Sequence, residues 1–534
     1  MSLARNTAII GGLTLISRLL GFARDLILAA ALGAGPIADA FFAALRFPNL
    51  FRRLFAEGAF SQAFVPVYAK TLASEGEAAA DRLAAEALSV LLLATGALTA
   101  VAILGMSWIN RVLFVGYVDD PATFALATVL TQITMPYLVC MTAATLYSGV
   151  LNARGKFFVA AAAPILLNLC LLVAVWPVRD NPQSAAFAAA AAVTVSGLLQ
   201  AIWVWFGARR AGASSGLTAP RITPGVKRLV ALAIPGAIAG GALQINVLVS
   251  QALASFEPGA ITYLNVADRL YQLPLGLIGI AVGVAMLPRL ARLVHEGDAS
   301  GARAALDEAV ALAMAFTLPA AAALLAMPAY LIDGLFSRGA FTPEDAKNVG
   351  LALFHYGWGV PAFVLAKIYA PAFFAREDTK APMRYALTSM ALNVALGAAL
   401  FFAFRAAGVH GFPGLAIATS AAAWLNVGLM IRSLNRSGAY APTPAAYARL
   451  GRILLASAVL FAVMWTANAN RAAFDAALGS KEAAVATLIL AGGTLYFVVA
   501  FLVRAVTIGE VRAAFRRERG PAGGGGGLPP GLEG

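Results

Sequence analysis

Residues 17–53 read SRLLGFARDLILAAALGAGPIADAFFAALRFPNLFRR, and they contain two long apolar stretches that also carry several charged side chains. The whole chain has 534 residues, of which 60% are hydrophobic and 12% are charged. A soluble globular chain is about half apolar and about a quarter charged. The composition therefore indicates an integral membrane protein, for which the bilayer acts as the solvent.

Apolar stretches of similar length recur along the chain. A spanning helix needs about 20 apolar residues because the hydrocarbon core is about 30 Å thick, and open strands cannot satisfy their backbone groups in lipid. The sequence therefore predicts an all-α integral membrane protein with about 14 transmembrane helices. The expected spans are 7–32, 38–66, 84–107, 125–150, 157–177, 185–207, 228–254, 260–288, 306–333, 346–374, 382–404, 411–431, 449–469 and 482–504.

A faint internal repeat indicates how these spans are grouped. Residues 151–173 and 373–396 each contain an Ala-Arg pair at a turn, then a proline, then an apolar helix with an asparagine, Asn168 or Asn393. The two segments are six spans apart, which is typical of a transporter with a site between its halves. We therefore expect two six-helix lobes around a central cavity, followed by two C-terminal helices.

The expected boundaries follow from this grouping. They are 1–210 for the N-terminal lobe, 211–435 for the C-terminal lobe, 436–508 for the two C-terminal helices, and 509–534 for a Gly-rich tail that we expect to be disordered in the cytoplasm.

Lys and Arg are distributed unequally between the two sides of the membrane. Loops after even-numbered spans, together with the tail, hold 24 of them, whereas loops after odd-numbered spans hold six. Cytoplasmic loops are enriched in Lys and Arg, so the asymmetry predicts that both termini are cytoplasmic. It also accounts for most of the net charge of +13, and nucleic acid is therefore not expected as a partner.

The residues needed for metal or acid–base chemistry are sparse. Cys140 and Cys170 lie in apolar runs, and the chain has three histidines and no CxxC motif. An enzyme acting on a lipid would need paired carboxylates, a histidine or a metal site facing one surface, and the sequence offers no convincing set. We therefore expect no enzymatic activity, no metal and no cofactor.

Cations at apparent membrane depth are the most informative feature. Each arginine costs roughly 3 kcal/mol at a helix centre on insertion scales, so these side chains are expected to face a partner or a hydrated cavity. Eight remain after the loops are subtracted: Arg18, Arg24, Arg46, Arg52, Arg53, Arg269, Lys347 and Lys367.

Residue spacing places many of these charges on shared helix faces. Asp39, Arg46 and Arg53 are seven residues apart, and Asn49 and Glu57 join their stripe. In the first span, Ser17 and Arg24 are seven residues apart, and so are Arg18 and Asp25. The eighth span adds a polar cluster of Asp268, Arg269 and Gln272.

One alternative is that these charges simply pair: Arg18 with Asp25, Arg53 with Glu57, and Arg269 with Asp268. The stoichiometry argues against it, because four carboxylates, counting Asp39, face six arginines. An arginine short of a partner suits phosphate, since its planar fork holds two oxygens. Lys347 and Lys367 are expected to snorkel or to pair with Glu344 and Asp345.

Three segments resemble the bacterial MurJ/MviN family of lipid II flippases, which belongs to the multidrug/oligosaccharidyl-lipid/polysaccharide exporter superfamily. They are SRLLGFARD (17–25), ADAFFAALRFPNLFRRLFAEGAFSQAFVPVY (38–68) and NVADRLYQLPLGLIGIAVGVAMLPRLARL (265–293). The resemblance covers the chain except its tail. It implies a bacterial inner-membrane protein that moves lipid II, undecaprenyl-pyrophosphate carrying a disaccharide-pentapeptide, to the periplasmic leaflet by alternating access. It also implies that 436–508 form a groove for the lipid tail, with membrane lipids and the cell-wall synthesis machinery as further partners.

The same resemblance implies a substrate site. Arg18, Arg24 and Arg52 in one lobe, with Arg269 in the other, are expected to contact the pyrophosphate. The supporting polar residues of the cavity are expected to be Ser17, Asp25, Asp39, Asn49, Arg53, Asp268 and Gln272.

This sequence departs from many relatives at two positions. They carry an acidic residue in place of Gln272 and an aspartate near Gln251. If such carboxylates bind a coupling cation, this protein lacks them, so the membrane potential and a cation both remain open as the energy source.

Three other functions compete with this interpretation. A drug/cation antiporter of related architecture would need acidic cavity residues, whereas this cavity is expected to be basic. A flippase for another polyprenyl-linked glycan would also have a related architecture. A membrane scaffold for cell-wall assembly would leave the arginines within the bilayer unexplained.

Overall fold

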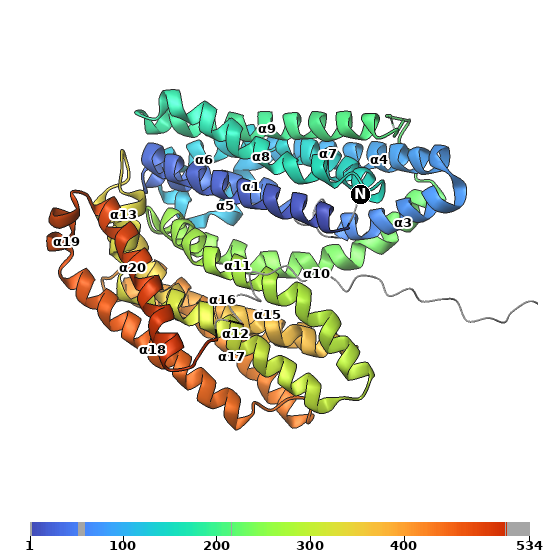
Figure 1. The fold of residues 1–534 in the computed structure, drawn as a ribbon. Coiled ribbons are helices and arrows are strands. Elements are labelled where there is room, and N and C mark those ends of the chain that lie inside the picture. The colour runs from blue at the N-terminus through green and yellow to red at the C-terminus, as the bar shows by residue number, and fades with distance from the viewer. Residues whose placement is uncertain (1–2, 52–58, 215, 508, 510–534) are drawn as a thin grey trace, which may run out of the picture.

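The structure is a computed structural model that describes residues 3–51, 59–214, 216–507 and 509. Every regular element in these residues is a helix, which confirms the predicted all-α fold. The helices form two lobes that converge at one end, with α10 (Pro224–Ala254) and α11 (Ala260–His295) running between them (Figure 1).

The N-terminal lobe is packed around α9, which contacts both α7 and α8, while α8 contacts α1. Side-chain caps followed by proline begin two of its helices: Asp120 accepts from the backbone N–H of Thr123, and Asn181 accepts from that of Ser184. The elements are α1 (Leu3–Leu32), α2 (Pro36–Phe51), α3 (Ala59–Glu75), α4 (Glu77–Leu104), α5 (Met106–Leu113), η2 (Val115–Asp119), α6 (Pro121–Thr134), α7 (Tyr137–Ala153), α8 (Phe157–Val175), η3 (Trp176–Val178) and α9 (Pro182–Arg210).

The C-terminal lobe is arranged around α11, which contacts α12, α14 and α15, while α17 packs along α16. A reciprocal capping box between Thr342 and Asp345 begins α14. After α11, the elements of this lobe are α12 (Ala299–Ala326), α13 (Pro328–Phe336), α14 (Pro343–Gly357), α15 (Val360–Phe374), α16 (Lys380–Ala406) and α17 (Phe412–Arg436). α10 contacts both α3 of the N-terminal lobe and α16 of this lobe, so it joins the two.

The C-terminal helices are α18 (Pro444–Ala469), α19 (Arg471–Leu478) and α20 (Lys481–Leu502). α18 packs along α12, and α20 packs against α18 and α13. These helices therefore lie on the C-terminal lobe. The predicted disordered tail lies outside the described residues, except for residue 509.

Ten segments of the described chain are long and apolar enough to cross a membrane. The predicted spans 7–32, 38–66, 228–254 and 260–288 are not among them. Three of these four are continuous helices, and the range 38–66 contains residues 52–58, which are not described. The count of fourteen is therefore not confirmed. The ten segments are Glu77–Leu104, Pro121–Ala153, Phe157–Val178, Pro182–Arg210, Ala299–Ala326, Pro343–Phe374, Lys380–Ala406, Phe412–Arg436, Pro444–Ala469 and Lys481–Leu502.

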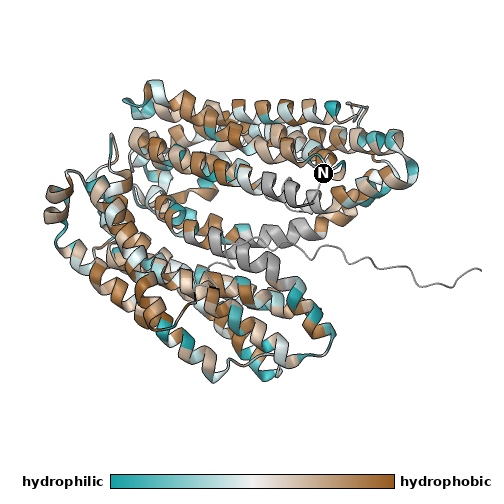
Figure 2. Cartoon of the chain, in the orientation of Figure 1, coloured by the Kyte–Doolittle hydropathy of each residue, from teal (hydrophilic) through white to brown (hydrophobic). Residues whose placement is uncertain are grey.

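The outer surface is apolar over most of the helices. In Figure 2 hydrophobic residues cover much of the helix length, and hydrophilic residues gather at helix ends and loops. Large apolar side chains stay exposed, with Leu104, Leu490 and Leu502 at 86%, 73% and 78%. Soluble monomers rarely expose such continuous apolar area, so this surface fits contact with lipid.

Both lobes hold the segment that follows their last helix in the same way, which fits the predicted internal repeat. The Asp81 carboxylate of α4 accepts from the Ser214 backbone N–H at 2.6 Å and from its hydroxyl at 3.0 Å. Asp307 of α12 accepts from the Tyr440 hydroxyl at 2.7 Å and from the Thr443 hydroxyl at 2.8 Å. The two aspartates are 226 residues apart, and Ser214 and Tyr440 have the same separation.

The lobes meet at what we call the inter-lobe seam, where three groups of hydrogen bonds lie near the end of α1. In the first, the Ala340 N–H donates to the Ala30 carbonyl at 2.7 Å. In the second, the Gly116 N–H donates to the Ser255 hydroxyl oxygen at 3.0 Å. The third is centred on Asp39.

Asp39 belongs to α2 but caps a helix of the other lobe. Its fully buried carboxylate accepts from the Gly259 N–H at 2.6 Å, the Thr262 N–H at 2.8 Å and the Thr262 hydroxyl at 2.6 Å. These N–H groups stand at the start of α11, where they have no partner within the helix. A single N-terminal-lobe side chain thus contributes three hydrogen bonds to the seam through the start of a C-terminal-lobe helix.

Candidate functional site

Two connected chambers lie between the lobes. The inner chamber has a volume of about 280 Å³ and is bounded by residues close to the seam, such as Leu28 and Phe42. The outer chamber has a volume of about 490 Å³ and extends to Ser17, Arg18 and Gln272, farther from the seam. The residues that line both are Arg24, Asp25, Tyr137, Leu167 and Arg269.

Asp25 stands where the chambers join and holds one arginine from each lobe. Its Oδ1 accepts from Arg24 Nη2 at 2.6 Å and from Arg24 Nε at 3.0 Å. Its Oδ2 lies 3.5 Å from Arg269 Nε of α11. The Arg24 and Asp25 side chains are 13% and 16% exposed, whereas Arg269 is 56% exposed. Arg24 is therefore fixed in place, and Arg269 can leave at lower cost.

Asn168 of α8 fixes Arg24 from the far side. Its Oδ1 accepts from Arg24 Nη1 at 2.9 Å, and its Nδ2 donates to the Ser17 carbonyl at 3.0 Å. Because Asn168 is buried, both contacts form where few waters compete. The guanidinium of Arg24 is thus oriented by two side chains before any cargo enters.

A second cross-lobe contact lies deeper, in the inner chamber. Arg46 Nη2 of α2 donates to Asn265 Oδ1 of α11 at 2.6 Å. Asn265 Nδ2 donates in turn to the Ile261 carbonyl at 2.6 Å. Asn265 and Arg269 are four residues apart, so they present their side chains on one face of α11.

The outer chamber adds further cations. Arg18 lines it together with Lys367 of α15. The expected ion pair of Lys367 with Glu344 or Asp345 does not occur among the described residues, and Lys367 lines the outer chamber. Lys347 does form the expected pair, with its Nζ 2.8 Å from Glu344.

The predicted pairing alternative fails for the two pairs that lie within the described residues. Asp25 binds Arg24 and Arg269, and no ion pair between Asp25 and Arg18 occurs among the described residues. Asp268 instead accepts from the Gln272 side-chain amide. Arg53 and Glu57 lie outside the described residues.

The other predicted site residues divide into three groups. Ser17, Asn49 and Gln272 line the chambers as expected. Asp39 and Asp268 are not among the described lining residues, because Asp39 caps α11 and Asp268 turns to Gln272. The predicted site residue Arg52 lies outside the described residues.

The resulting site is strongly basic. The described residues that line the chambers include one carboxylate, Asp25, and five cations. The cations are Arg18, Arg24, Arg46, Arg269 and Lys367. Such a cavity favours an anionic group that can meet guanidinium groups from both lobes.

Comparison with known proteins connects this site to a family. The family profile described as "Lipid II flippase MurJ" matches residues 28–480. The chain belongs to the lipid II flippase MurJ family. A probable lipid II flippase MurJ of Rhizobium tropici is 42% identical over 97% of this chain and 98% of its own length. Because ten segments of the described residues are long and apolar enough to cross a membrane, this MurJ family member is a multi-pass membrane protein.

Solved structures share the fold. A structure titled "Lipid II flippase MurJ, inward closed conformation" matches with a TM-score of 0.76 at 23% identity, covering 93% of this chain and 99% of that chain. An inward-facing multidrug resistance MATE transporter of the MOP superfamily matches with a TM-score of 0.64 at 14% identity, covering 79% of this chain and 95% of its own. The MurJ family and the MATE transporters therefore share the helical architecture seen here.

The cavity of this MurJ family member is also lined by residues that the sequence does not predict for the substrate site, among them Arg46, Asn168, Asn265 and Lys367. The sequence predicts that Lys367 snorkels or forms an ion pair, and it distinguishes Asn168 only as part of the internal repeat. Asn265 could have been found, because it lies one turn before Arg269 on α11. Nothing in the sequence indicated that Asn168 would meet Arg24, since 144 residues separate them.

Replacing Asn168 with leucine is expected to lower the free energy of unfolding by roughly 1–2 kcal/mol, because Arg24 loses an acceptor and the Ser17 carbonyl loses a donor. A less oriented Arg24 should also bind lipid II more weakly. Denaturation and lipid II binding in detergent would measure both effects. Asn393→Leu is the matched control, since Asn393 is also buried but is not a described lining residue. Equal lipid II affinity in both variants would contradict the orienting role.

Proposed function

We propose that this protein flips lipid II from the cytoplasmic to the periplasmic leaflet of the bacterial inner membrane. Membership of the MurJ family supports the identity of the cargo. The structural observation that carries the proposal is the placement of Arg24 and Arg269, from opposite lobes, on the single carboxylate of Asp25.

The charge of the site fits the pyrophosphate of lipid II. As a diester, pyrophosphate carries a negative charge on each of its two phosphates, so it can contact both guanidinium groups as Asp25 does, and with more charge. A guanidinium holds two phosphate oxygens in one plane, which a lysine cannot do. Arg18 and Lys367 in the outer chamber lie where they attract this anion on entry.

Alternating access follows from the position of the seam. The seam closes one end of the cavity, while Arg18 and Gln272 are exposed at the other end. With both termini cytoplasmic, as the Lys and Arg distribution favours, the outer chamber faces the cytoplasm and loads lipid II there. Rocking of the lobes then separates Asp39 from α11 and opens the periplasmic side.

The polyprenyl tail remains in lipid during this cycle, lying along α18 and α20. The transport step needs no cofactor. A membrane potential contributes about 2.3 kcal/mol per charge per 100 mV, and a negative cytoplasm favours export of an anion. Gln251 and Gln272 carry no charge, so we propose the potential as the energy source rather than a cation bound at those positions. Enzymes of cell-wall synthesis would consume the exported cargo.

Depletion of the protein in its host tests this function. Lipid II is expected to accumulate in the cytoplasmic leaflet, where an externally added enzyme that cleaves lipid II cannot reach it. Restoring the protein should restore cleavage. Accumulation in the periplasmic leaflet would contradict the proposal, and normal lipid II with accumulation of another polyprenyl-linked glycan would favour the alternative cargo.

A further inference from the structure

α13 and the turn after it touch the N-terminal lobe on one side. The Phe336 ring packs edge-on against Phe22 of α1, with ring centroids 6.0 Å apart. The Ala340 N–H donates to the Ala30 carbonyl at 2.7 Å, which is one of the seam contacts. The position of α13 therefore affects whether the seam can close.

The two backbones pack directly against each other at this contact. A Cβ on Gly339, whose φ is +59°, would stand 2.3 Å from the Ala30 carbonyl oxygen. A Cβ on Gly33 would stand 2.7 Å from the Ala340 carbonyl oxygen. Because no side chain separates the two segments, a small displacement of the turn after α13 breaks the contact.

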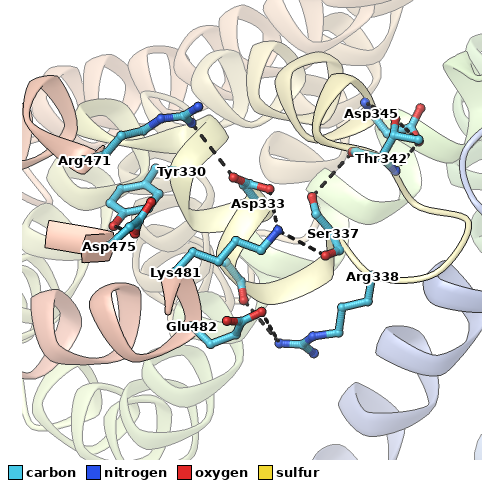
Figure 3. Close-up of polar contacts among 11 residues, drawn as sticks. Tyr330, Asp333, Ser337, Arg338, Thr342, Asp345, Arg471, Asp475, Lys481 and Glu482 are labelled. Carbon is cyan, nitrogen blue, oxygen red and sulfur yellow. Dashed lines mark hydrogen bonds and ion pairs between the residues drawn. The ribbon is translucent and has the colours of Figure 1, made fainter. Parts of the chain in front are cut away.

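On its other side α13 is held by the C-terminal helices (Figure 3). Lys481 Nζ donates to Asp333 Oδ1 at 3.0 Å and to the Ser337 carbonyl at 3.1 Å. Arg471 Nη1 of α19 lies 4.0 Å from Asp333 Oδ2. Lys481 thus contacts both Asp333 within α13 and Ser337, the C-cap residue of this helix.

Further contacts flank this pair. The Tyr330 hydroxyl donates to Asp475 at 2.5 Å, and Arg338 lies 3.6 Å from Glu482. A Cβ on Gly334 would stand 2.6 Å from a Val485 methyl group, so α13 and α20 pack closely. We call these contacts the C-terminal clasp, which consists of Tyr330, Asp333, Ser337, Arg338, Arg471, Asp475, Lys481 and Glu482.

The central pair of the clasp differs from an ordinary surface ion pair. Exposed pairs contribute little to stability, but the Asp333 and Lys481 side chains are only 14% and 27% exposed. Lys481 is also the first residue of α20, where the helix dipole disfavours a cation. Its ammonium group also lies at the C-terminal end of α13, where the helix dipole favours a cation. The placement of Lys481 therefore serves α13 rather than α20.

We propose that Asp333 and Lys481 couple the C-terminal helices to the inter-lobe seam. The pair holds the turn after α13 against α1 while the seam is closed, and a displacement of α20 loosens the seam. Because the proposed function places the polyprenyl tail along α18 and α20, the tail can then promote opening. Asp333 is thus a positioning residue that acts through α13.

Spin-label distances across the seam test this coupling without any cargo. Labels at Asp119→Cys and Val409→Cys, both exposed and in opposite lobes, would be read by pulsed electron resonance in nanodiscs. Cys140→Ala and Cys170→Ala remove the native thiols. Lys481→Met and Asp333→Asn are each expected to raise the population with the longer inter-lobe distance by about five- to tenfold. The double variant should open the seam no further than either single variant.

Lys347→Met is the matched control, because it breaks an exposed ion pair on α14 and should leave the distances unchanged. Unaltered distances in both Lys481→Met and Asp333→Asn would overturn the coupling. Fully additive effects in the double variant would also overturn it, since the two residues would then act separately. Neither result depends on flipping, whereas failure of the wild-type protein to move lipid II would refute the proposed function alone.

Discussion

Arg269→Ala is expected to abolish lipid II flipping while the protein still inserts and folds. Arg269 is 56% exposed and its nearest carboxylate oxygen, on Asp25, is 3.5 Å away, so its removal costs little stability. The cargo, however, loses the guanidinium contributed by the C-terminal lobe. Truncating a charged contact of this kind costs about 2–5 kcal/mol, which corresponds to at least about a 30-fold loss of affinity. Arg24→Ala should abolish flipping too, with an added loss of stability because Arg24 is nearly buried.

Transport of lipid II in proteoliposomes, together with growth after depletion of the chromosomal copy, would measure the effect of Arg269→Ala. Arg289→Ala is the matched control, since Arg289 is also on α11, is 54% exposed and pairs with Glu308. The control should support normal flipping. Arg269→Lys should restore flipping in part, because it keeps the charge but not the planar fork. Normal flipping by Arg269→Ala would refute the role of this residue in binding pyrophosphate.

Asp39→Ala is expected to open the seam. Three donors of the other lobe lose their acceptor, and two of them are backbone N–H groups at the start of α11. Hydrogen bonds to a buried acceptor of this kind should stabilise the closed seam by roughly 3 kcal/mol in total. The equilibrium between closed and open seam should therefore shift by about 100-fold. Flipping should fall, since the state that loads cargo is depleted.

The same pair of spin labels would measure this shift. Asp298→Ala is a suitable control because Asp298 caps α12 through Gly301 within one lobe, so its loss should leave the inter-lobe distances unchanged. Asp39→Asn should have a smaller effect, since one amide oxygen can still accept. An unchanged distance distribution in Asp39→Ala would show that the other seam contacts are sufficient.

The sequence predicted the helical fold because hydrophobic length and low charge are local properties of the chain. It also predicted that Arg18, Arg24 and Arg269 face one cavity, since a charge within the bilayer has few other places to lie. The pairing within that cavity was not predictable. Arg24 pairs with its neighbour Asp25, and that same carboxylate reaches across to Arg269, which depends on how the lobes meet.

Asp39 illustrates the same limit. Its spacing with Arg46 placed both on one stripe of a helix, yet Arg46 faces the inner chamber and Asp39 caps α11. Which part of a stripe faces water and which faces another helix depends on packing between segments more than 200 residues apart. Periodicity carries no information about that packing.

The hydrogen bonds that hold the segment after α9 have a mechanical consequence. Ser214 is tied to Asp81, Thr218 to Ser89, and Thr223 to Glu86, so the connection between the lobes travels with the N-terminal lobe almost to its last residue. This connection therefore has little free length with which to accommodate a rotation of one lobe against the other. We therefore expect the bending that accompanies transport to occur in α10, which begins at Pro224 and packs on both lobes. In this respect α10 would act as the hinge between the lobes, in addition to lining the cavity.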